Sequence, residues 1–599
     1  MEKLLVANRG EIAVRVIRTA REMGLQTVAV YSEIDRAAMH VRLADEAYLL
    51  GPASPALSYL NGERILDIAR RSGAQAIHPG YGFLAENADF ARSVLEADLT
   101  WIGPHPGAID AMGDKMRARQ AMIAAGVPVV PGGTEAIVDA KAASKAAEEY
   151  GLPLALKASG GGGGKGLKIA YTLDDIAAAL STAKREAEAY FKNGAIYAER
   201  YLENPKHIEL QILADKHGSV LHVGERDCSL QRRHQKLCEE TPPNIPQRVR
   251  EEIRRAGIRA AQAIGYDSVG TIEWLVTGDK FFFLEMNTRI QVEHTVTEMT
   301  SGLDLVREQI RVAAGEPLEY SQDAVVFRGH SIEGRINAED PSQGFRPSPG
   351  TIGAYREPGG LGVRIDSAAF PGFKISADYD SLIAKLIVWA PTRSEALARF
   401  RRALDEYLIE GVPTTLPLLR DLCDHPPVMD GTYTTSTLET FAAARYAADR
   451  SASTNVMVSP SVMVSPSTSS GQAVVEPPPS VVDGRISENI SVEVNDKLYH
   501  VRVFDRPNRA AAARKPRRSP LKDRKLTASG NDVVSPMHGV VVEMPVSEGD
   551  AVAAGQVVAV VEAMKMMNEI RAHKAGTVAK VLAKPGETVE AHSVLATIQ

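Results

Sequence analysis

Two glutamates, Glu273 and Glu285, lie in the apolar segments TIEWLV and FFFLE, which a short Gly-Asp-containing turn separates. β-Branched and aromatic residues dominate both segments, so they predict two antiparallel strands. A three-residue loop centred on Asp279 would make the two glutamates cross-strand neighbours on one face. Like charges in such positions are destabilising unless a cation lies between them. With Asn287 next on that face, the three side chains offer the oxygen ligands of a Mg²⁺ ion shared with phosphates.

Polar side chains keep alternating with apolar ones beyond this hairpin. Arg289, Gln291 and Glu293 fall on one side, and Ile290 and Val292 fall between them. A merely solvated strand could show the same alternation. Beside paired carboxylates, however, a row of side chains that can bind anions or move a proton favours a functional face.

Glycines Gly160 to Gly164 are consecutive, and Lys165 and Gly166 follow them. Such a run is either a flexible linker or a loop whose bare backbone N–H groups fold over phosphates. The flanking segments LALKA and LKIA both predict strands, so the run joins two strands rather than two domains. We therefore favour a mobile hairpin lid. It is not a Walker A loop, because glycine rather than serine or threonine follows the lysine.

One lysine near the C-terminus, Lys565, lies between two copies of an internal repeat. Residues 539–561 align without a gap on residues 576–598. Each copy predicts short strands broken by a Gly-Asp or Gly-Glu turn, and a repeat implies one supersecondary unit used twice. Two such units related by a pseudo-two-fold axis predict a small flattened β-sandwich with Lys565 on a tight exposed turn. The alternative is an ordinary solvated lysine.

Three further segments carry polar side chains. His207, Glu209 and Gln211 share one face of a strand with an aliphatic opposite face, which on pattern alone favours a half-exposed antiparallel strand with one wet face. The segment from Arg226 to Lys236 predicts a dense cationic loop suited to anions. The segment IYAERYL predicts a strand and hinge whose backbone groups could meet an adenine.

The elements that must position these residues begin with a parallel sheet. The segment LLVA, a following helical pattern and TVAVY predict a βαβ unit near the N-terminus. No GxGxxG motif follows the first strand, so a scaffold and a nucleotide-binding domain both stay open.

Composition narrows the class of protein. The 599 residues suggest about four domains. A net charge of −6 disfavours general nucleic-acid binding, and no apolar run is long enough to span a membrane. Cys228, Cys238 and Cys423 show no CxxC spacing, which fits a reducing compartment without disulfides or a zinc site. We see no signal peptide and expect a cytoplasmic protein without a nucleic-acid or membrane partner.

Low-complexity segments separate the two halves of the chain. Residues 447–483 repeat VMVSP and predict a linker. Residues 484–506 alternate around Asn495-Asp496 and predict a β-hairpin, either a subunit-contact region or a strand pair that closes against the same chain. Residues 507–530 are basic and predict a second, solvated linker.

Several motifs together resemble the ATP-grasp biotin carboxylases over residues 1 to about 446. They are NRGEIA, HPGYGFLAEN, MGDK, KASGGGGGKG, RDCSLQRRHQK, EMNTRIQVEH and EGRINAEDP. EAMKM around Lys565, with the preceding Ser-Pro-Met, resembles the attachment sequence of biotin carboxyl carrier domains; lipoyl domains share that fold but usually carry Asp-Lys-Ala. The departures are small and touch only edges of the site, at Lys165, Arg200 and Gly334.

The resemblance implies a multidomain α/β and all-β chain. It places a Rossmann-like N-terminal domain at 1–112, an ATP-grasp domain at 113–325, a biotin carboxylase C-terminal domain at 326–446 and a biotinyl carrier domain, the flattened β-sandwich, at 531–599.

The resemblance also implies roles for individual residues. Those expected to bind ATP are Lys115, Lys157, Gly160, Gly161, Gly162, Gly163, Gly164, Lys165, Gly166, Glu199, Arg200, Tyr201, Leu202, His207, Gln231 and His234. The expected Mg²⁺ or Mn²⁺ ligands are Glu273, Glu285 and Asn287. Arg289, Gln291 and Val292 would hold bicarbonate, with Arg289 also catalytic and Glu293 as the general base. Lys236 and Arg335 would meet carboxyphosphate and the biotin oxygen, and Lys565 would carry the covalent biotin.

The implied activity is the ATP- and bicarbonate-dependent carboxylation of biotin through carboxyphosphate. No acceptor-binding region remains in the chain, so we expect the α subunit of an acyl-CoA carboxylase that supplies carboxybiotin to a separate carboxyltransferase β subunit, with acetyl-CoA or propionyl-CoA as acceptor. A biotin protein ligase and further copies of the chain are the other expected partners. The alternatives are a pyruvate, methylcrotonyl-CoA or urea carboxyltransferase as partner, or an inactive scaffold that presents a carrier domain.

Overall fold

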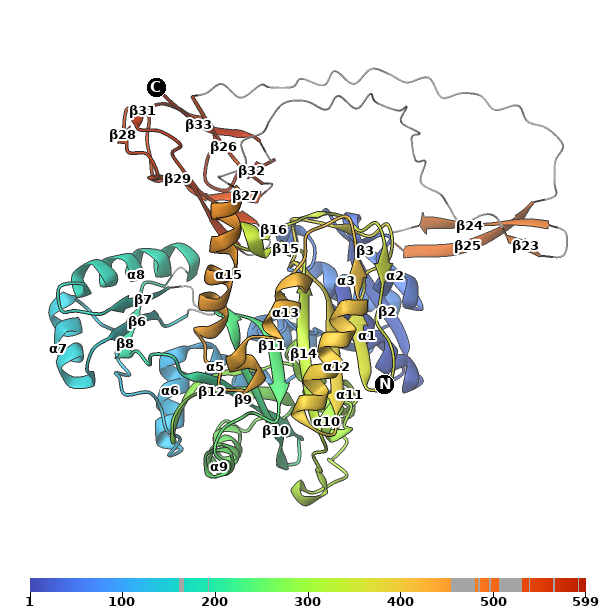
Figure 1. Ribbon diagram of the computed structural model, residues 1–599. Coiled ribbons are helices and arrows are strands. Elements are labelled where there is room, and N and C mark those ends of the chain that lie inside the picture. The colour runs from blue at the N-terminus through green and yellow to red at the C-terminus, as the bar shows by residue number, and fades with distance from the viewer. Residues whose placement is uncertain are drawn as a thin grey trace, which may run out of the picture. The chain divides into compact units, whose positions relative to one another are not determined.

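The computed structural model describes residues 1–160, 166–191, 193–453, 480–482, 485–494, 497–505, 531–537, 539–563, 566–590 and 592–599. The chain divides into two compact units (Figure 1). The larger unit consists of residues 1–46, 50–375 and 381–447, and the second consists of residues 47–49, 376–380 and 448–599. The paired glutamates belong to the larger unit, and the internal repeat belongs to the second.

Residues near the N-terminus form the predicted parallel sheet. β1 (Lys3–Val6), β2 (Gln26–Ser32), β4 (Ala76–His78) and β5 (Thr100–Trp101) are parallel and lie in the order β2-β1-β4-β5. α1 (Gly10–Glu22) connects β1 to β2 and buries an apolar face. The predicted βαβ unit is confirmed.

A three-stranded sheet carries the glycine run. β6 (Leu154–Ala158) pairs antiparallel with β7 (Leu167–Ala170) and with β8 (Ile196–Arg200). Helices α7 (Ala140–Tyr150) and α8 (Ile176–Phe191) pack on this sheet, as Figure 1 shows. The two strands on either side of the glycines therefore form the predicted hairpin, but residues 161–165 at its tip lie outside the described residues.

An eight-stranded antiparallel sheet is the centre of the larger unit. Its strands are, in spatial order, β13 (Lys280–Asn287), β12 (Val269–Thr277), β9 (Lys206–Ala214), β10 (Val220–Arg232), β11 (Gln235–Thr241), β14 (His330–Asn337), β21 (Leu382–Ala390) and β19 (Val363–Ser367). The last three strands come from the region predicted as a separate C-terminal domain. One continuous sheet thus joins the regions 113–325 and 326–446.

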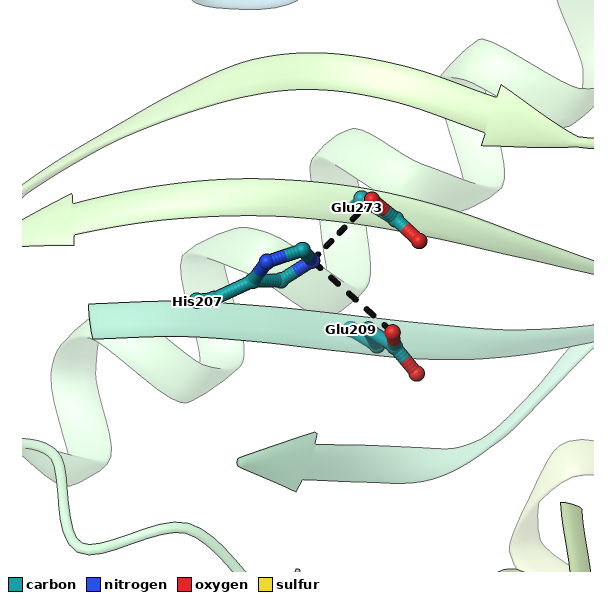
Figure 2. Close-up of side chains that lie close together, drawn as sticks. All are labelled: His207, Glu209 and Glu273. Carbon is teal, nitrogen blue, oxygen red and sulfur yellow. Dashed lines mark ion pairs between the residues drawn. The ribbon is translucent and has the colours of Figure 1, made fainter. Parts of the chain in front are cut away.

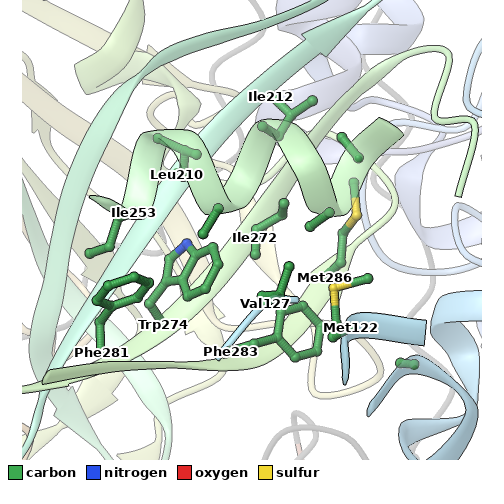
Figure 3. Close-up of a cluster of buried hydrophobic side chains, with 14 of the residues drawn as sticks. Met122, Val127, Leu210, Ile212, Ile253, Ile272, Trp274, Phe281, Phe283 and Met286 are labelled. Carbon is green, nitrogen blue, oxygen red and sulfur yellow. The ribbon is translucent and has the colours of Figure 1, made fainter. Parts of the chain in front are cut away.

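One face of β9 and β12 packs against helix α9 (Gln247–Ala263) in an apolar core (Figure 3). Trp274 is fully buried there, with its ring edge-on to those of Phe281 and Phe283. A Cβ on Gly257 would lie 2.2 Å from the side chain of Leu210, so α9 approaches the sheet closely at this glycine. Because side chains alternate along a strand, the opposite face is left to the polar residues.

The C-terminal repeat forms the predicted flattened sandwich. One sheet contains β26 (Asp532–Val534), β33 (Val594–Ile598), β31 (Gly576–Val581) and β28 (Ala551–Val552); the other contains β30 (Met566–Arg571), β29 (Val557–Ala563), β27 (Gly539–Glu543) and β32 (Thr588–Val589). Gly539 and Gly576 occupy equivalent positions: a Cβ would lie 2.4 Å from the carbonyl oxygen of Glu562 at the first and 2.3 Å from that of Gln599 at the second. The pseudo-two-fold relation is therefore present in three dimensions.

The region between the two folded parts contains more structure than predicted. Helix α15 (Thr437–Ser453) continues past the predicted start of the linker at residue 447, and β23 (Ser480–Val482) lies near its predicted end. β24 (Arg485–Val494) and β25 (Lys497–Asp505) form the predicted hairpin. The turn residues Asn495 and Asp496, and the basic linker from residue 507 to 530, lie outside the described residues.

Two expectations from composition can be compared with the described part of the chain. No helix within it is both long and apolar enough to cross a membrane. Cys228, Cys238 and Cys423 are buried free thiols. The expectation of no disulfide therefore holds for all three cysteines.

Candidate active site

Glu273 and Glu285 lie opposite each other on β12 and β13, as predicted, but the turn differs from the prediction. Thr277 pairs with Lys280, so the turn contains two residues rather than three. A bulge next to Glu273 adds the residue that brings the two glutamates into register. The pairing is thus confirmed and the predicted loop length is wrong.

The polar face of β9 is buried, and the wet face favoured by its pattern is wrong. His207 is 5% exposed, and Glu209 and Gln211 are fully buried. Figure 2 shows His207 pointing at two carboxylates, with its Nε2 3.0 Å from an oxygen of Glu273 and 3.8 Å from one of Glu209. Burial alone would lower the pKa of His207, but Glu273 raises it above its ordinary value.

Lys236 is the cation at the centre of this acidic group. Its Nζ donates to Glu273 Oε1 at 2.9 Å, to Glu293 Oε1 at 2.8 Å and also to Glu209. Burial opposes its charge, but the three carboxylates together raise the pKa of Lys236 well above its usual value. The lysine is therefore held protonated in a buried setting where an anionic substrate could exchange with a carboxylate.

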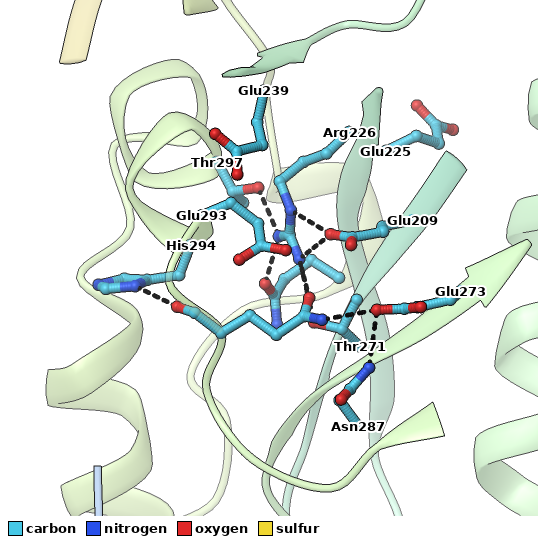
Figure 4. Close-up of polar contacts among 12 residues, drawn as sticks. Glu209, Glu225, Arg226, Glu239, Thr271, Glu273, Asn287, Glu293, His294 and Thr297 are labelled. Atoms are coloured by element: carbon cyan, nitrogen blue, oxygen red, sulfur yellow. Dashed lines mark hydrogen bonds and ion pairs between the residues drawn. The ribbon is translucent and has the colours of Figure 1, made fainter. Parts of the chain in front are cut away.

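A fully buried arginine, Arg226, organises the neighbouring side chains (Figure 4). Its guanidinium donates to Glu209 at 2.9 Å, to the side-chain oxygen of Gln291 at 2.8 Å and to the hydroxyl groups of Thr271 and Thr297. The sequence indicated a cationic loop here. Instead, Arg226 lies within β10, where it fixes other side chains and is not free to bind an anion.

The polar alternation beyond Asn287 does not belong to a strand, because β13 ends at this residue and an irregular segment leads to helix α10 (His294–Ser301). This segment still turns its polar groups toward the site. Arg289 donates to Glu86 at 2.9 Å and to Asn287 Oδ1 at 2.8 Å. Gln291 donates to Glu273 Oε1 at 2.9 Å. A bent segment thus places side chains where a straight strand would carry them away.

Glu293 has one cation on each carboxylate oxygen. Oε1 accepts from Lys236, and Oε2 accepts from Arg335 at 3.0 Å. Burial would raise the pKa of Glu293, but these two cations hold it well below its usual value. The preceding residue is fixed through its backbone, since the carbonyl oxygen of Val292 accepts from Lys385 Nζ at 2.9 Å. Glu293 can therefore accept a proton once a substrate displaces one of its cations.

The two lysines expected at the ATP phosphates are each paired with a glutamate. Lys115 Nζ lies 2.8 Å from Glu285 Oε2. Lys157 forms an ion pair with Glu199, whose other oxygen lies 3.4 Å from Arg119. The side chain of Glu199 therefore forms ion pairs with Lys157 and Arg119.

The remaining expected ATP-binding residues lie at strand ends. The backbone N–H groups of Arg200 and Tyr201 donate to the carbonyl oxygens of Pro131 and Pro153, both at 2.8 Å, and Leu202 follows, half-buried. The Gln231 amide lies 3.5 Å from His207 Nδ1. Arg233 and His234 form the turn between β10 and β11 with φ of 47° and 65°.

The structure brings most of the expected residues into one site. Lys236, Glu273, Gln291, Glu293 and Arg335 are linked by direct contacts. Of the expected lid, Gly160 and Gly166 are described, whereas the residues between them lie outside the described residues, as does Lys565; the strands β29 and β30 on either side of Lys565 pair as a hairpin. Arg226 and Glu239, which hold other site residues in place, were not predicted.

The side chains around the glutamate pair fit a hard divalent cation. Glu273 and Glu285 supply carboxylate oxygens from adjacent strands, and Asn287 supplies an amide beside them. In this structure Lys115 and Lys236 neutralise the two carboxylates. Both carboxylates therefore already contact a positive charge, and their oxygens, with the amide oxygen of Asn287, are the ligands that Mg²⁺ prefers.

Family descriptions match four parts of the chain. Residues 1–109 match the biotin carboxylase N-terminal domain, and residues 114–321 match the ATP-binding domain of the carbamoyl-phosphate synthase L chain. Residues 333–440 match the biotin carboxylase C-terminal domain, and residues 531–598 match the description "biotin-requiring enzyme".

Individual proteins that are similar to this chain are also biotin-dependent carboxylases or parts of them. The chain is 44% identical to the biotin-dependent acyl-coenzyme A carboxylase alpha3 subunit of Mycobacterium leprae, over 100% of this chain and 98% of the relative. It is 50% identical to biotin carboxylase 1 of Bacillus subtilis, over 74% and 99% of the two chains. A crystal structure of the biotin carboxylase domain dimer of Hydrogenobacter thermophilus 2-oxoglutarate carboxylase, with MgADP, ADP and bicarbonate, is 52% identical, with a TM-score of 0.72 over 74% of this chain and 98% of that one.

Proposed function

The chain belongs to the biotin carboxylase family, and from this premise we propose that it is the α subunit of an acyl-CoA carboxylase, with the residue roles argued below. It carboxylates biotin with ATP and bicarbonate. The observation that carries the assignment of the site is the contact of Glu293 with both Lys236 and Arg335 at the end of the paired-glutamate hairpin.

Glu293 is the base for bicarbonate in this proposal. It is ionised, buried and held between two cations. Bicarbonate that enters beside Arg289 and Gln291 would take over the contact with one cation and leave a Glu293 oxygen free to accept its proton. The backbone of Val292, fixed by Lys385, keeps this glutamate in position.

Cations around the site would stabilise the charge of phosphoryl transfer from ATP to bicarbonate. Lys115, at the start of a helix, pairs with Glu285 of β13, and Lys157 of β6 pairs with Glu199 of the adjoining β8. Lys236 of β11 reaches Glu209 of β9 across β10, the strand between them. When bound, Mg²⁺ would neutralise phosphate oxygens, with Glu273, Glu285 and Asn287 as its ligands. Transfer of the carboxyl group to biotin then needs a cation at the developing negative oxygen, and Arg335 is proposed for that contact.

A separate subunit would complete the reaction. The similarity to an acyl-CoA carboxylase alpha subunit over the whole chain supports a carboxyltransferase β subunit as partner and acetyl-CoA or propionyl-CoA as acceptor. Biotin protein ligase would attach biotin at Lys565. We also propose that the chain forms a homo-oligomer, that its domains have the bounds predicted from the sequence, and that it is located in the cytoplasm. A pyruvate, methylcrotonyl-CoA or urea carboxyltransferase as partner is the second candidate, since the similar 2-oxoglutarate enzyme shows that the carboxylase half serves other acceptors.

Two experiments test the proposal. ATP cleavage should occur only when bicarbonate is present and the chain carries biotin. Cleavage that needs neither would exclude the proposed roles. Isolation of the chain from its own cells should recover a carboxyltransferase subunit that accepts a short-chain acyl-CoA. Recovery of a subunit that carboxylates pyruvate or another acceptor would exclude the acyl-CoA assignment.

A further inference from the structure

A second pair of glutamates lies behind Arg335. Glu239 on β11 and Glu333 on β14 are register partners in the antiparallel ladder, so their side chains point to the same face. Both are fully buried. Directly opposed like charges destabilise a sheet, and a buried pair has no solvent to reduce the repulsion.

Each carboxyl group in this pair has one engaged and one unengaged oxygen. Arg335 Nε donates to Glu239 Oε1 at 2.6 Å, and the hydroxyl of Thr295 donates to Glu333 Oε2. The other two oxygens, Glu239 Oε2 and Glu333 Oε1, are buried and have no hydrogen-bond partner. Two bare buried oxygens on opposed residues can both be satisfied by one proton held between them.

The surrounding charges do not compensate two ionised carboxylates. Arg335 and Lys236 face Glu239, but Glu293 faces it as well. Lys385 and, more weakly, Arg335 face Glu333, but Arg335 is shared with Glu239, and the Nζ of Lys385 also lies 3.2 Å from Glu11 of α1 and 3.9 Å from Asp366 of β19.

The two groups differ in how strongly they hold a proton. Burial raises the pKa of Glu239 to about 7. Burial, opposed by Lys385, raises the pKa of Glu333 well above its ordinary value. Glu239 alone has a direct arginine contact, so the proton belongs on Glu333 and the charge on Glu239.

We propose that Glu333 is protonated at neutral pH and donates a hydrogen bond from Oε1 to Glu239 Oε2, and that this singly charged pair positions Arg335. Glu239 and Glu333 are positioning residues, because neither touches the reacting groups. The proposal rests on the role given to Arg335 above. Arg335 contacts both Glu239 and Glu293, so the charge of the pair decides how strongly Glu239 competes with Glu293 for the guanidinium.

Conservative and non-conservative substitutions separate this arrangement from simple packing. In Glu333→Gln the amide can donate to Glu239 as the protonated acid does, so we expect biotin-dependent ATP cleavage within about twofold of wild type. We also expect the activity of this variant to fall less than that of wild type as the pH rises, because the amide does not lose its proton. In Glu333→Leu the donor is lost, and we expect kcat to fall about tenfold with an unchanged KM for ATP. A Glu333→Gln variant as slow as Glu333→Leu would overturn the proposal.

Infrared spectroscopy detects the proton without any turnover. At neutral pH the full-length protein should show the C=O stretch of a buried protonated carboxylic acid, and Glu333→Gln should lose it. Glu240→Gln is the matched control: Glu240 is the next residue on β11 and is also buried, but His330 and Arg393 hold it ionised, so this variant should keep the band.

The infrared and ATP-cleavage measurements test different proposals, so failure of one proposal can be told from failure of the other. Absence of the acid band, or its persistence in Glu333→Gln, would overturn the shared proton whatever the enzyme catalyses. Absence of bicarbonate-dependent ATP cleavage in wild-type protein would instead count against the proposed function, and the infrared result would still decide whether the pair holds a proton.

Discussion

At the level of single residues, Glu293 is the group on which the proposed chemistry depends most. Each of its oxygens accepts a hydrogen bond from a cation, so its negative charge is balanced. Substrate binding must rearrange these contacts. This exchange explains how a carboxylate with a lowered pKa can still take a proton from bicarbonate in the occupied site.

Removal of this base gives the first prediction. Glu293→Gln should lower biotin-dependent ATP cleavage by about 10²- to 10⁴-fold, the range for a positioned general base, while ATP binding is retained. Arg289→Ala should also nearly abolish cleavage, because the bicarbonate contact is lost. Parallel turnover and nucleotide-binding assays measure both effects, with the exposed Glu319→Gln as control. Normal turnover in Glu293→Gln would exclude its role.

A buried histidine gives a pH prediction. Burial lowers the pKa of His78 from 6.5 to about 3, and its Nδ1 accepts from the backbone of Gly80. Below pH 6.5 the unfolded chain binds a proton that the folded chain excludes, so the free energy of unfolding decreases as the pH falls toward 3. The contribution is about 1.4 kcal/mol per pH unit.

Thermal unfolding at about pH 7 and about pH 5 checks this dependence. His78→Asn should flatten the loss of stability between the two pH values, because the titrating group is gone. An unchanged pH dependence in that variant would show that other groups cause it.

The residues that meet at the candidate site were easier to predict from the sequence than the residues that hold them in place. Glu273, Glu285 and Glu293 could be found because paired carboxylates and alternating polar residues are visible in a linear sequence. Arg226 and Glu239 could not, because a charged residue in a strand indicates exposure until the partners that bury it are known. Those partners come from other strands, distant along the chain.

At the level of elements, the central hairpin shows how a correct pairing can follow from an incorrect turn. Alternation predicts which faces meet, but it does not reveal a bulge, and the added residue, Leu284 beside Glu285, shifted the turn without changing the pair. The polar face of β9 was misjudged for a related reason. A two-residue period indicates two different faces, not that one of them is wet.

The sandwich offers a prediction at this scale, because two equivalent glycines lie against backbone carbonyl groups. Gly539→Ala and Gly576→Ala should each destabilise the C-terminal domain by about 1–3 kcal/mol, since the backbone cannot yield easily. Gly359→Ala is the control, because no atom lies within 4 Å of its Cβ position and its φ is not left-handed.

Hydrogen exchange of the C-terminal domain within the full chain measures the effect. Faster exchange across both sheets is expected for either variant in this domain, and the control should leave it unchanged. Equal protection in wild type and both variants would show that the close approach to Glu562 and Gln599 is not needed for stability.

At the level of the whole molecule, one chain contains both the carboxylase region and the domain that carries biotin. Linking the two makes their encounter intramolecular, so it does not depend on the concentration of free biotin. Resemblance of short motifs was sufficient to predict both parts.

The proposed activity requires that this chain carboxylate its own biotin, attached at Lys565. Chain produced together with a biotin protein ligase can be incubated with ATP, Mg²⁺ and isotopically labelled bicarbonate, and the label that stays on the protein can be measured. We expect ATP-dependent label on the wild-type chain and none on Lys565→Arg. Equal labelling of the two chains, or no ATP-dependent label on biotinylated wild type, would contradict this expectation.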